Sequence, residues 1–165
     1  MNDQEGGIDF ERLLEEIQSQ LMEQARAIYS PQVIKHAYNP RNLGRLEWPD
    51  AYRHVDGSCG DSMEMYLRVA GKGTDDESIE AITFMTDGCG TTLACGSMLT
   101  TMVQGMSLEE ASQIEPEDLL DALGGLPEAS VHCANLAVTT LRETIAHWYR
   151  RTRRQRRAPD GDRRR

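Results

Sequence analysis

The sequence predicts an α+β fold, with helices packed on one side of a small three-stranded antiparallel sheet and an amphipathic helix in front of them. Three observations lead to this prediction. A helical period comes first, three short strand-like segments occupy the middle of the chain, and helical periods return after them. The 165 residues fit one domain, and no internal repeat is visible.

Residues 8–28 place apolar side chains at helical spacing, with glutamates among the other positions. The apolar positions are Ile8, Phe10, Leu13, Leu14, Ile17, Leu21, Ala25 and Ile28. Residues 1–28 are therefore predicted to be an N-terminal amphipathic extension. We expect its apolar stripe to pack on its own domain. Packing on a second copy or on another protein are the alternatives that the sequence leaves open.

A short second helix is expected over residues 31–38. Ser30 is a favourable N-cap, and Pro31 suits the first helical position because a missing N–H costs nothing there. The segment 39–44, Asn-Pro-Arg-Asn-Leu-Gly, should end this helix.

Three strands are predicted at about 52–56, 63–69 and 79–86. The second strand alternates most clearly, with Met63, Met65, Leu67 and Val69 between polar or aromatic neighbours. The linker 70–77 is rich in Gly and Asp, so the second and third strands should form a hairpin.

Four helices are expected after the sheet, and turn and cap residues mark their ends. The first covers 91–104 and ends at Gly105, and Ser107 with Glu110 has the spacing of a capping box for the next. A short helix follows from Pro116 to the glycines at 124 and 125. The last helix should begin near residue 127 and continue past Trp148.

The net charge of −9 conceals a division of the chain. Residues 150–165 hold nine Arg and two Asp, a net charge of +7, whereas residues 1–149 hold nine basic and 25 acidic residues, a net charge of −16. We predict a disordered Arg-rich tail over 150–165, most simply a solvated one, although RNA, an anionic surface or an acidic partner are conceivable ligands. A nucleic-acid-binding domain is not expected, since the basic residues do not belong to a structured face.

The sequence predicts neither a membrane span nor a secretory signal. No stretch approaches the 18 to 20 apolar residues of a spanning helix, and the first 30 residues are acidic. The expected location is the cytoplasm, where cysteines are metal ligands or reactive thiols more often than disulfides.

The four cysteines are therefore the main candidates for function. Cys59 precedes Gly60-Asp61, Cys89 lies between two glycines just before a predicted helix, and Cys133 follows His132. Glycine permits close approach of a bulky ligand, and a helix N-terminus stabilises a thiolate. The alternatives are three small buried residues, a turn cap at Asp61 and a solvated imidazole at His132.

Several motifs in one order resemble the NifU/IscU-type iron–sulfur cluster assembly scaffolds. They are Tyr-Ser-Pro-Gln-Val-Ile at 29–34, Asn-Pro-Arg-Asn-Leu-Gly at 39–44, Cys-Gly-Asp at 59–61, Gly-Cys-Gly at 88–90 and His-Cys at 132–133. The resemblance covers residues 29–149, which we take as the scaffold domain. It implies the same three-stranded sheet flanked by helices.

The resemblance implies a cluster site, with [2Fe–2S] as the expected form. Cys59, Cys89 and Cys133 would be its thiolate ligands, Asp61 the acidic residue linked to cluster lability, and His132 a fourth ligand in competition with Asp61. Three soft thiolates with one weaker ligand suit a cluster that must be released. The protein would be a carrier, not an enzyme, and its partners would be an IscS/NifS-type cysteine desulfurase, iron and electron donors, and apo-proteins that receive the cluster.

Two further hypotheses concern sulfur. Cys133 is the predicted persulfide acceptor, because sulfur transfer requires an exposed thiol of low pKa and His132 is its neighbour. Alternatively, Zn²⁺ occupies the same site and the protein is a SufU-like sulfurtransferase, although the short step from Cys89 to Cys133 and the presence of His132 favour the scaffold.

Two positions depart from the family pattern. The Leu-Pro-Pro-Val-Lys segment that binds an Hsp70-type chaperone in many members reads Leu-Pro-Glu-Ala-Ser at 126–130, so its lysine is missing. This argues against a chaperone partner. Cys95 lies six residues after Cys89, about 120° away on a helix, so it is expected to pack in the core.

Overall fold

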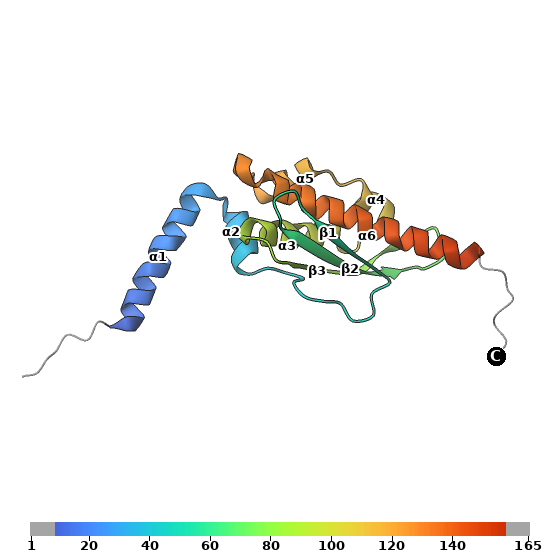
Figure 1. Ribbon diagram of the computed structural model, residues 1–165, viewed down its shortest axis with the longest axis horizontal. Helices are drawn as coiled ribbons and strands as arrows, with labels where there is room; N and C mark the ends of the chain where they lie inside the picture. The colour runs from blue at the N-terminus through green and yellow to red at the C-terminus, as the bar shows by residue number, and fades with distance from the viewer. Residues whose placement is uncertain (1–8, 158–165) are drawn as a thin grey trace, which may run out of the picture.

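Helices and strands follow one another in the order that the sequence predicts. The computed structural model describes residues 9–157. Its elements are α1 (Phe10–Ile28), α2 (Pro31–Tyr38), β1 (Ala51–Asp56), β2 (Ser62–Ala70), β3 (Ser78–Thr86), α3 (Gly90–Val103), α4 (Leu108–Ser112), α5 (Pro116–Leu123) and α6 (Val131–Arg157) (Figure 1).

The three strands form one antiparallel sheet in the order β1-β2-β3. Val55 pairs with Met63 across the first two strands, and Met65 pairs with Phe84 across the second two. The predicted hairpin between β2 and β3 is therefore confirmed. The segment before β1 lies along the outer edge of β3, where the Phe84 N–H donates to the carbonyl of Asn42 at 2.9 Å.

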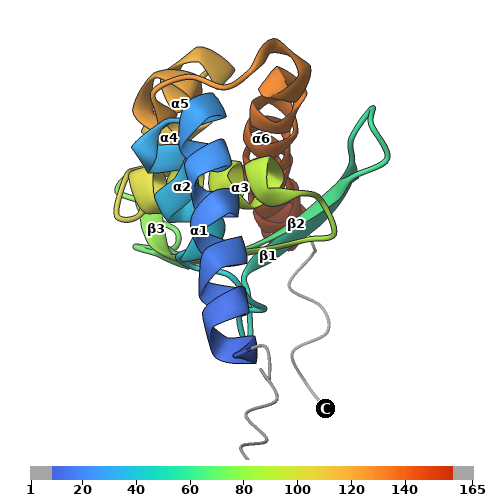
Figure 2. The same cartoon turned by 90° about the vertical axis from the view of Figure 1, so that its left-hand side faces the viewer.

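Alternation along β2 separates the two faces of the sheet. Met63, Met65 and Leu67 are fully buried beneath the helices, while Glu64 and Arg68 belong to the opposite face and are half-buried. Figure 2 shows the sheet nearly edge-on with α3 and α6 on the same side of it. The predicted α+β arrangement is confirmed.

The predicted caps are present at the helix ends. The Ser30 hydroxyl accepts a hydrogen bond from the Val33 N–H at 3.1 Å, and Ser107 with Glu110 forms a complete capping box. Gly124 ends α5 at φ 75°, a left-handed conformation that glycine adopts without steric cost.

Helix α6 starts later than predicted and continues past Trp148 as predicted. It begins at Val131, after a 3₁₀ turn over Glu128–Ser130, and it continues to Arg157. The first half of the Arg-rich tail is part of this helix, because arginine is a good helix former and its charge is favourable at a helix C-terminus. The second half of that tail, residues 158–165, lies outside the described residues.

Helix α1 extends away from the rest of the domain (Figure 1). None of its side chains over 10–28 is buried, and six large apolar residues are exposed: Phe10, Leu13, Leu14, Ile17, Leu21 and Ile28. The default expectation that the apolar stripe packs on its own domain is therefore wrong. Within residues 9–157, no helix is long and apolar enough to cross a membrane.

Candidate metal centre

Three segments that are far apart in the sequence meet at one end of the domain. The loop between β1 and β2 carries Cys59 and Asp61, Cys89 is the N-cap of α3, and the first turn of α6 carries His132 and Cys133. They meet because the antiparallel hairpin turns at the same end where α3 and α6 begin.

Backbone hydrogen bonds fix the loop that carries Cys59. The Gly57 N–H donates to the Asp61 carbonyl at 2.7 Å, and Gly60 adopts φ 90° at the turn. The Ser62 N–H donates to the Asp87 carboxylate at 2.6 Å, which ties the start of β2 to the end of β3. The loop therefore holds Cys59 and Asp61 above the start of α3.

The five predicted site residues form two groups that share Asp61. One group is Cys59, Asp61 and His132, and the other is Asp61, Cys89 and Cys133. In each group, one ligand atom per residue lies within 4.8 Å of the other two. The structure thus brings all five predicted residues to one place, with the Asp61 carboxylate between the two groups.

Two threonine hydroxyls connect the members of this centre. Thr91 Oγ1 lies 2.9 Å from Cys89 Sγ and 3.5 Å from Cys133 Sγ. Thr92 Oγ1 donates to Asp61 Oδ2 at 2.9 Å and lies 3.4 Å from Cys133 Sγ. Both threonines are buried, so their hydroxyls contact the carboxylate and the two thiols from the protein interior and restrict their positions.

Gly88 makes room for the contact between Asp61 and Thr92. A Cβ atom at residue 88 would lie 2.7 Å from Asp61 Oδ2 and 2.6 Å from Thr92 Oγ1. Any larger residue would force these two oxygens away from the centre. The glycine before Cys89 is therefore required by the close approach of the site's own side chains.

The environment of Cys89 favours its thiolate. Burial raises the pKa of the Cys89 thiol, but hydrogen bonds from the hydroxyls and N–H groups of Thr91 and Thr92 outweigh this and lower the pKa to about 7. Its side chain is exposed as well. Cys89 thus combines access with a reactive protonation state.

The environment of Cys133 favours its neutral thiol and limits access to its sulfur. Cys133 is 1% exposed, and burial raises the pKa of its thiol, with hydrogen bonds from Thr92 and Thr91 offsetting only part of the effect. The expectation that Cys133 is the first persulfide acceptor depended on exposure and a low pKa. The structure finds both properties at Cys89 and neither at Cys133, whose role as acceptor stays a prediction.

The remaining cysteine lies in the hydrophobic core. Cys95 is fully buried, and burial raises the pKa of its thiol. It belongs to neither group of ligand atoms among the described residues. The prediction that Cys95 packs in the core is confirmed.

The two histidines near these elements differ in role. His132 is half-buried, and its Nε2 lies 3.5 Å from the sulfur of its sequence neighbour Cys133. His36 is buried between α2 and α3, where its Nδ1 lies 2.7 Å from the Ser97 hydroxyl and burial lowers its pKa. His36 therefore joins two helices and takes no part in the centre.

Sequence reasoning did not identify the two threonines. Their signal was present, because hydroxyl residues two and three positions after a helix-capping cysteine lie in the first turn, close to its sulfur. Their contacts with Asp61 and Cys133 join segments 31 and 41 residues apart, and only the folded structure shows them.

The donor set suits a thiophilic metal ion or an iron–sulfur cluster. Three cysteine sulfurs are soft ligands that favour iron–sulfur clusters and zinc, while the carboxylate and imidazole are weaker ligands for such a group. Cys59 and Cys89 are exposed and Cys133 is buried, so solvent and partner proteins can reach two of the three thiols.

Comparison with known proteins identifies the family of this chain. Residues 28–155 match the NifU-like N terminal domain. The chain is 41% identical over 125 residues to iron-sulfur cluster assembly scaffold protein IscU 1 of Archaeoglobus fulgidus, covering 75% of this chain and 78% of that protein. It is 37% identical over 124 residues to the scaffold protein IscU of Haemophilus influenzae, covering 73% of this chain and 94% of that one.

A solved structure supports the fold independently. The N-terminal part of a NifU-like protein from Brucella abortus superposes with a TM-score of 0.57 at 20% identity, covering 74% of this chain and 95% of that one. At this identity the likeness supports only the fold. Taken with the sequence matches, it shows that this chain belongs to the family of NifU-like N-terminal domains.

Proposed function

We propose that the protein is a scaffold on which a labile iron–sulfur cluster is assembled and from which it is transferred to apo-proteins. The observation that carries this proposal is the gathering of three thiols and one carboxylate at an open end of the domain. Relatives at 37–41% identity are named as assembly scaffolds, which supports the same role.

The proposed ligands are Cys59, Cys89 and Cys133, with Asp61 as the weaker fourth ligand. Asp61 is favoured over His132 because its carboxylate belongs to both groups of ligand atoms and is oriented by Thr92. A hard carboxylate binds iron in such a cluster less firmly than a thiolate does. Release of the cluster would therefore begin at Asp61, and [2Fe–2S] remains the proposed form.

We further assign the first sulfur-acceptor role to Cys89. Its thiolate attacks the outer sulfur of a persulfide on a donor protein, the donor's S–S bond breaks, and the donor cysteine leaves as a thiolate. The sulfur then lies on Cys89, next to the other ligands. A cysteine desulfurase is the proposed donor, and iron, electrons and apo-protein acceptors complete the proposed set of partners.

The second candidate function is a zinc-containing sulfurtransferase. The observation in its favour is that Asp61, Cys89 and Cys133 lie close enough to share a zinc ion, with Cys59 in the adjoining group as the thiol that would complete a tetrahedral site. In that case zinc would hold the thiols tightly, and the protein would accept sulfur without assembling a cluster. The cytoplasmic location expected from the sequence remains a prediction under either function.

Anaerobic reconstitution separates the two functions. The protein is incubated with iron, cysteine and a cysteine desulfurase, and then analysed for iron, sulfide, zinc and visible absorption. We expect iron and sulfide in equal amounts, lost in Cys59→Ala, Cys89→Ala and Cys133→Ala. Cys95→Ala is the matched control, and it should retain the cluster because Cys95 is in the core. Tightly bound zinc without iron uptake, together with faster desulfurase turnover, would favour the sulfurtransferase.

A further inference from the structure

The apolar residues of α1 repeat with the period of a coiled coil. Phe10, Leu14, Ile17, Leu21 and Ile28 alternate in steps of three and four residues, and Gln24 completes the series. This is a heptad with Leu14, Leu21 and Ile28 at position a and Phe10, Ile17 and Gln24 at position d. A narrow stripe of this kind suits one partner helix better than the broad face of a globular core.

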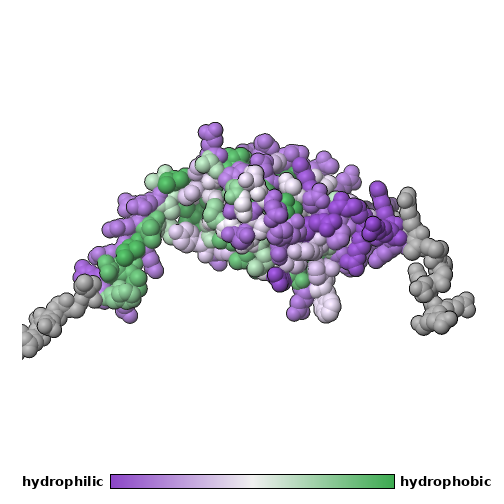
Figure 3. Space-filling model, viewed as in Figure 1, coloured by the Kyte–Doolittle hydropathy of each residue, from purple (hydrophilic) through white to green (hydrophobic). Residues whose placement is uncertain are grey.

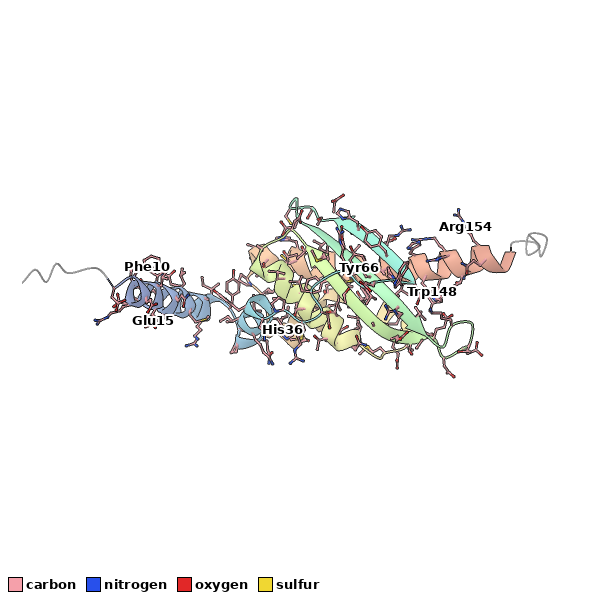
Figure 4. All side chains as sticks on the ribbon, turned by 90° about the horizontal axis from the view of Figure 1, so that it is seen from below. Phe10, Glu15, His36, Tyr66, Trp148 and Arg154 are labelled. Carbon is pink, nitrogen blue, oxygen red and sulfur yellow. The ribbon has the colours of Figure 1, made fainter. Side chains whose placement is uncertain are left out.

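We call the a and d positions of α1 (Phe10, Leu14, Ile17, Leu21, Gln24 and Ile28) the seam, and its apolar side chains are exposed. Figure 3 shows hydrophobic surface along α1, and Phe10, Leu21 and Ile28 are 68%, 55% and 62% exposed. Figure 4 shows Phe10 at the end of α1 that lies away from the sheet. Since no side chain of this 19-residue helix is buried, tertiary packing within the copy stabilises it little, and a partner along the apolar positions would stabilise it.

The charges of α1 favour a second copy over an anionic lipid surface. The outer positions of the helix carry Glu15, Glu16 and Glu23 against Arg12 and Arg26, whereas helices that bind anionic membranes have basic polar faces. The positions beside the seam hold Glu11, Leu13, Gln18, Gln20, Ala25 and Ala27. Two identical helices can therefore approach with almost no like charges beside their contact.

The available apolar area is sufficient for a specific pair. Each large apolar side chain buries about 100 Å² when it is covered. The six of α1, counting Leu13 beside the seam, would bury about 1,200 Å² in a pair of helices, the lower end of the range for specific interfaces. The pair is also isologous, so it closes as a dimer and does not extend further.

We propose that α1 pairs with α1 of a second copy as an antiparallel two-helix coiled coil. Residues 29–149 carry 18 acidic and seven basic residues, a net charge of −11. Antiparallel pairing places these two acidic domains at opposite ends of a helix of about 28 Å, well beyond the screening length at physiological salt. Parallel pairing would place them at the same end.

The heptad also fixes the antiparallel register. The twofold axis crosses the pair at the level of residue 19 along the helix. Ile17 then faces Leu21 of the second copy, and Phe10 faces Ile28 of the second copy. Each a position then lies against a d position throughout the contact. Gln24, facing Leu14 of the second copy, is the polar exception in the seam.

This register brings the second copy to the metal centre. An apolar groove of about 370 Å³ lies where α1 meets α2, and its lining includes Ala25, Tyr29, Val33 and Cys89. Ile28 is next to this groove in the chain, so Phe10 of the second copy would lie at its mouth. Each copy would thereby cover part of the approach to the other's Cys89.

Sedimentation equilibrium of the metal-free full chain tests the pairing. We expect a dimer at micromolar concentrations, and Leu21→Glu should raise its dissociation constant more than about 100-fold because a carboxylate would enter an apolar seam. Ser19→Glu, which introduces the same charge on the opposite side of the helix, is the control and should remain dimeric. A wild type that is monomeric up to hundreds of micromolar, or a dimer that tolerates Leu21→Glu, overturns the proposal.

A mixing experiment tests the antiparallel register. Ile17→Lys and Leu21→Glu should each be monomeric alone, and their mixture should form a heterodimer, because the introduced lysine would face the introduced glutamate only when the helices are antiparallel. A mixture that stays monomeric contradicts the register. The centre lies outside the seam, so a monomeric Leu21→Glu variant that still binds metal leaves the proposed function intact.

Discussion

The Thr92 hydroxyl has one proton to donate and three possible acceptors near it. It donates to Asp61 at 2.9 Å, while the sulfur of Cys133 lies 3.4 Å away and that of Cys89 lies 3.7 Å away. One proton cannot serve all three, so the hydroxyl orients the carboxylate in the metal-free protein. We regard Thr92 as a positioning residue for Asp61.

Replacement of Thr92 by valine tests this role. Valine has the shape of threonine without the hydroxyl, so Asp61 loses its orienting donor. Loss of such a supporting hydrogen bond lowers metal affinity by roughly 10-fold or more, and we expect this for Zn²⁺ measured by competition with a chromophoric chelator. Thr92→Ser keeps the hydroxyl and should bind as the wild type does. Equal affinity in Thr92→Val and the wild type would contradict the positioning role.

The difference between Cys89 and Cys133 predicts selective alkylation. A thiol reacts as its thiolate, and the thiolate fraction increases as pH rises through the pKa. Cys89, with a pKa of about 7, should therefore react with iodoacetamide at half its maximal rate near pH 7 in the metal-free protein. Cys133 should react more slowly across the same pH range, since it is buried and its pKa is raised.

Peptide mapping by mass spectrometry measures both rates. Thr91→Val removes the hydrogen bond at 2.9 Å from the Cys89 sulfur and should shift the Cys89 profile to higher pH. Faster modification of Cys133 than of Cys89 would show that the assignment of the first acceptor is wrong.

The sequence could predict which residues gather at the centre, but not how they differ. Cys59, Cys89 and Cys133 were identifiable from their neighbours and from the order of motifs. The burial of Cys133 and the hydroxyl contacts of Thr92 depend on how α3 and α6 pack, which no local pattern records. The sequence therefore offered no means of ranking the three thiols by exposure or pKa, and the acceptor role of Cys133 stays a prediction.

At the scale of elements, close packing of α3 on β3 depends on one glycine. A Cβ atom at Gly96 would lie 2.4 Å from the ring of Phe84, and that ring is fully buried. The ring cannot move aside without displacing its neighbours in a close-packed core. Gly96 thus sets the distance between helix and sheet, and with it the position of Cys89 at the start of α3.

Gly96→Ala should destabilise the fold despite the better helix propensity of alanine. The propensity gain is about 1 kcal/mol, and overpacking a core costs about 1–3 kcal/mol. We expect a lower midpoint in urea unfolding. Gly90→Ala is the matched control on the same helix, because its Cβ would have only an ordinary contact at 3.8 Å. A Gly96→Ala variant more stable than the wild type would contradict the packing argument.

Local signals explain why the elements themselves were predictable. Ser30, Ser107 and Gly124 mark helix ends through hydrogen bonds and backbone angles that depend on a few adjacent residues. The free face of α1 was not predictable in this way, because it depends on what lies near that helix in space.

At the scale of the whole molecule, the arginine-rich surface and the metal centre lie at opposite ends. The metal centre lies where α3 and α6 begin, whereas Arg154 lies near the far end of α6 (Figure 4). Arg53, Arg150 and Arg151 line a groove at that same end. A partner that docks on the arginines would therefore leave the centre uncovered, as transfer of a cluster to another protein requires.

Cluster transfer is the measurement that tests the central claim most directly. The reconstituted protein is mixed with an apo-ferredoxin in the presence of an iron chelator, and the circular dichroism of the acceptor's cluster is followed. The account predicts transfer without loss of iron to the chelator, and slower transfer from Asp61→Cys, in which a firmly binding thiolate replaces the weak ligand. Equal transfer rates for both proteins, or a purified protein that holds zinc and transfers nothing, would contradict it.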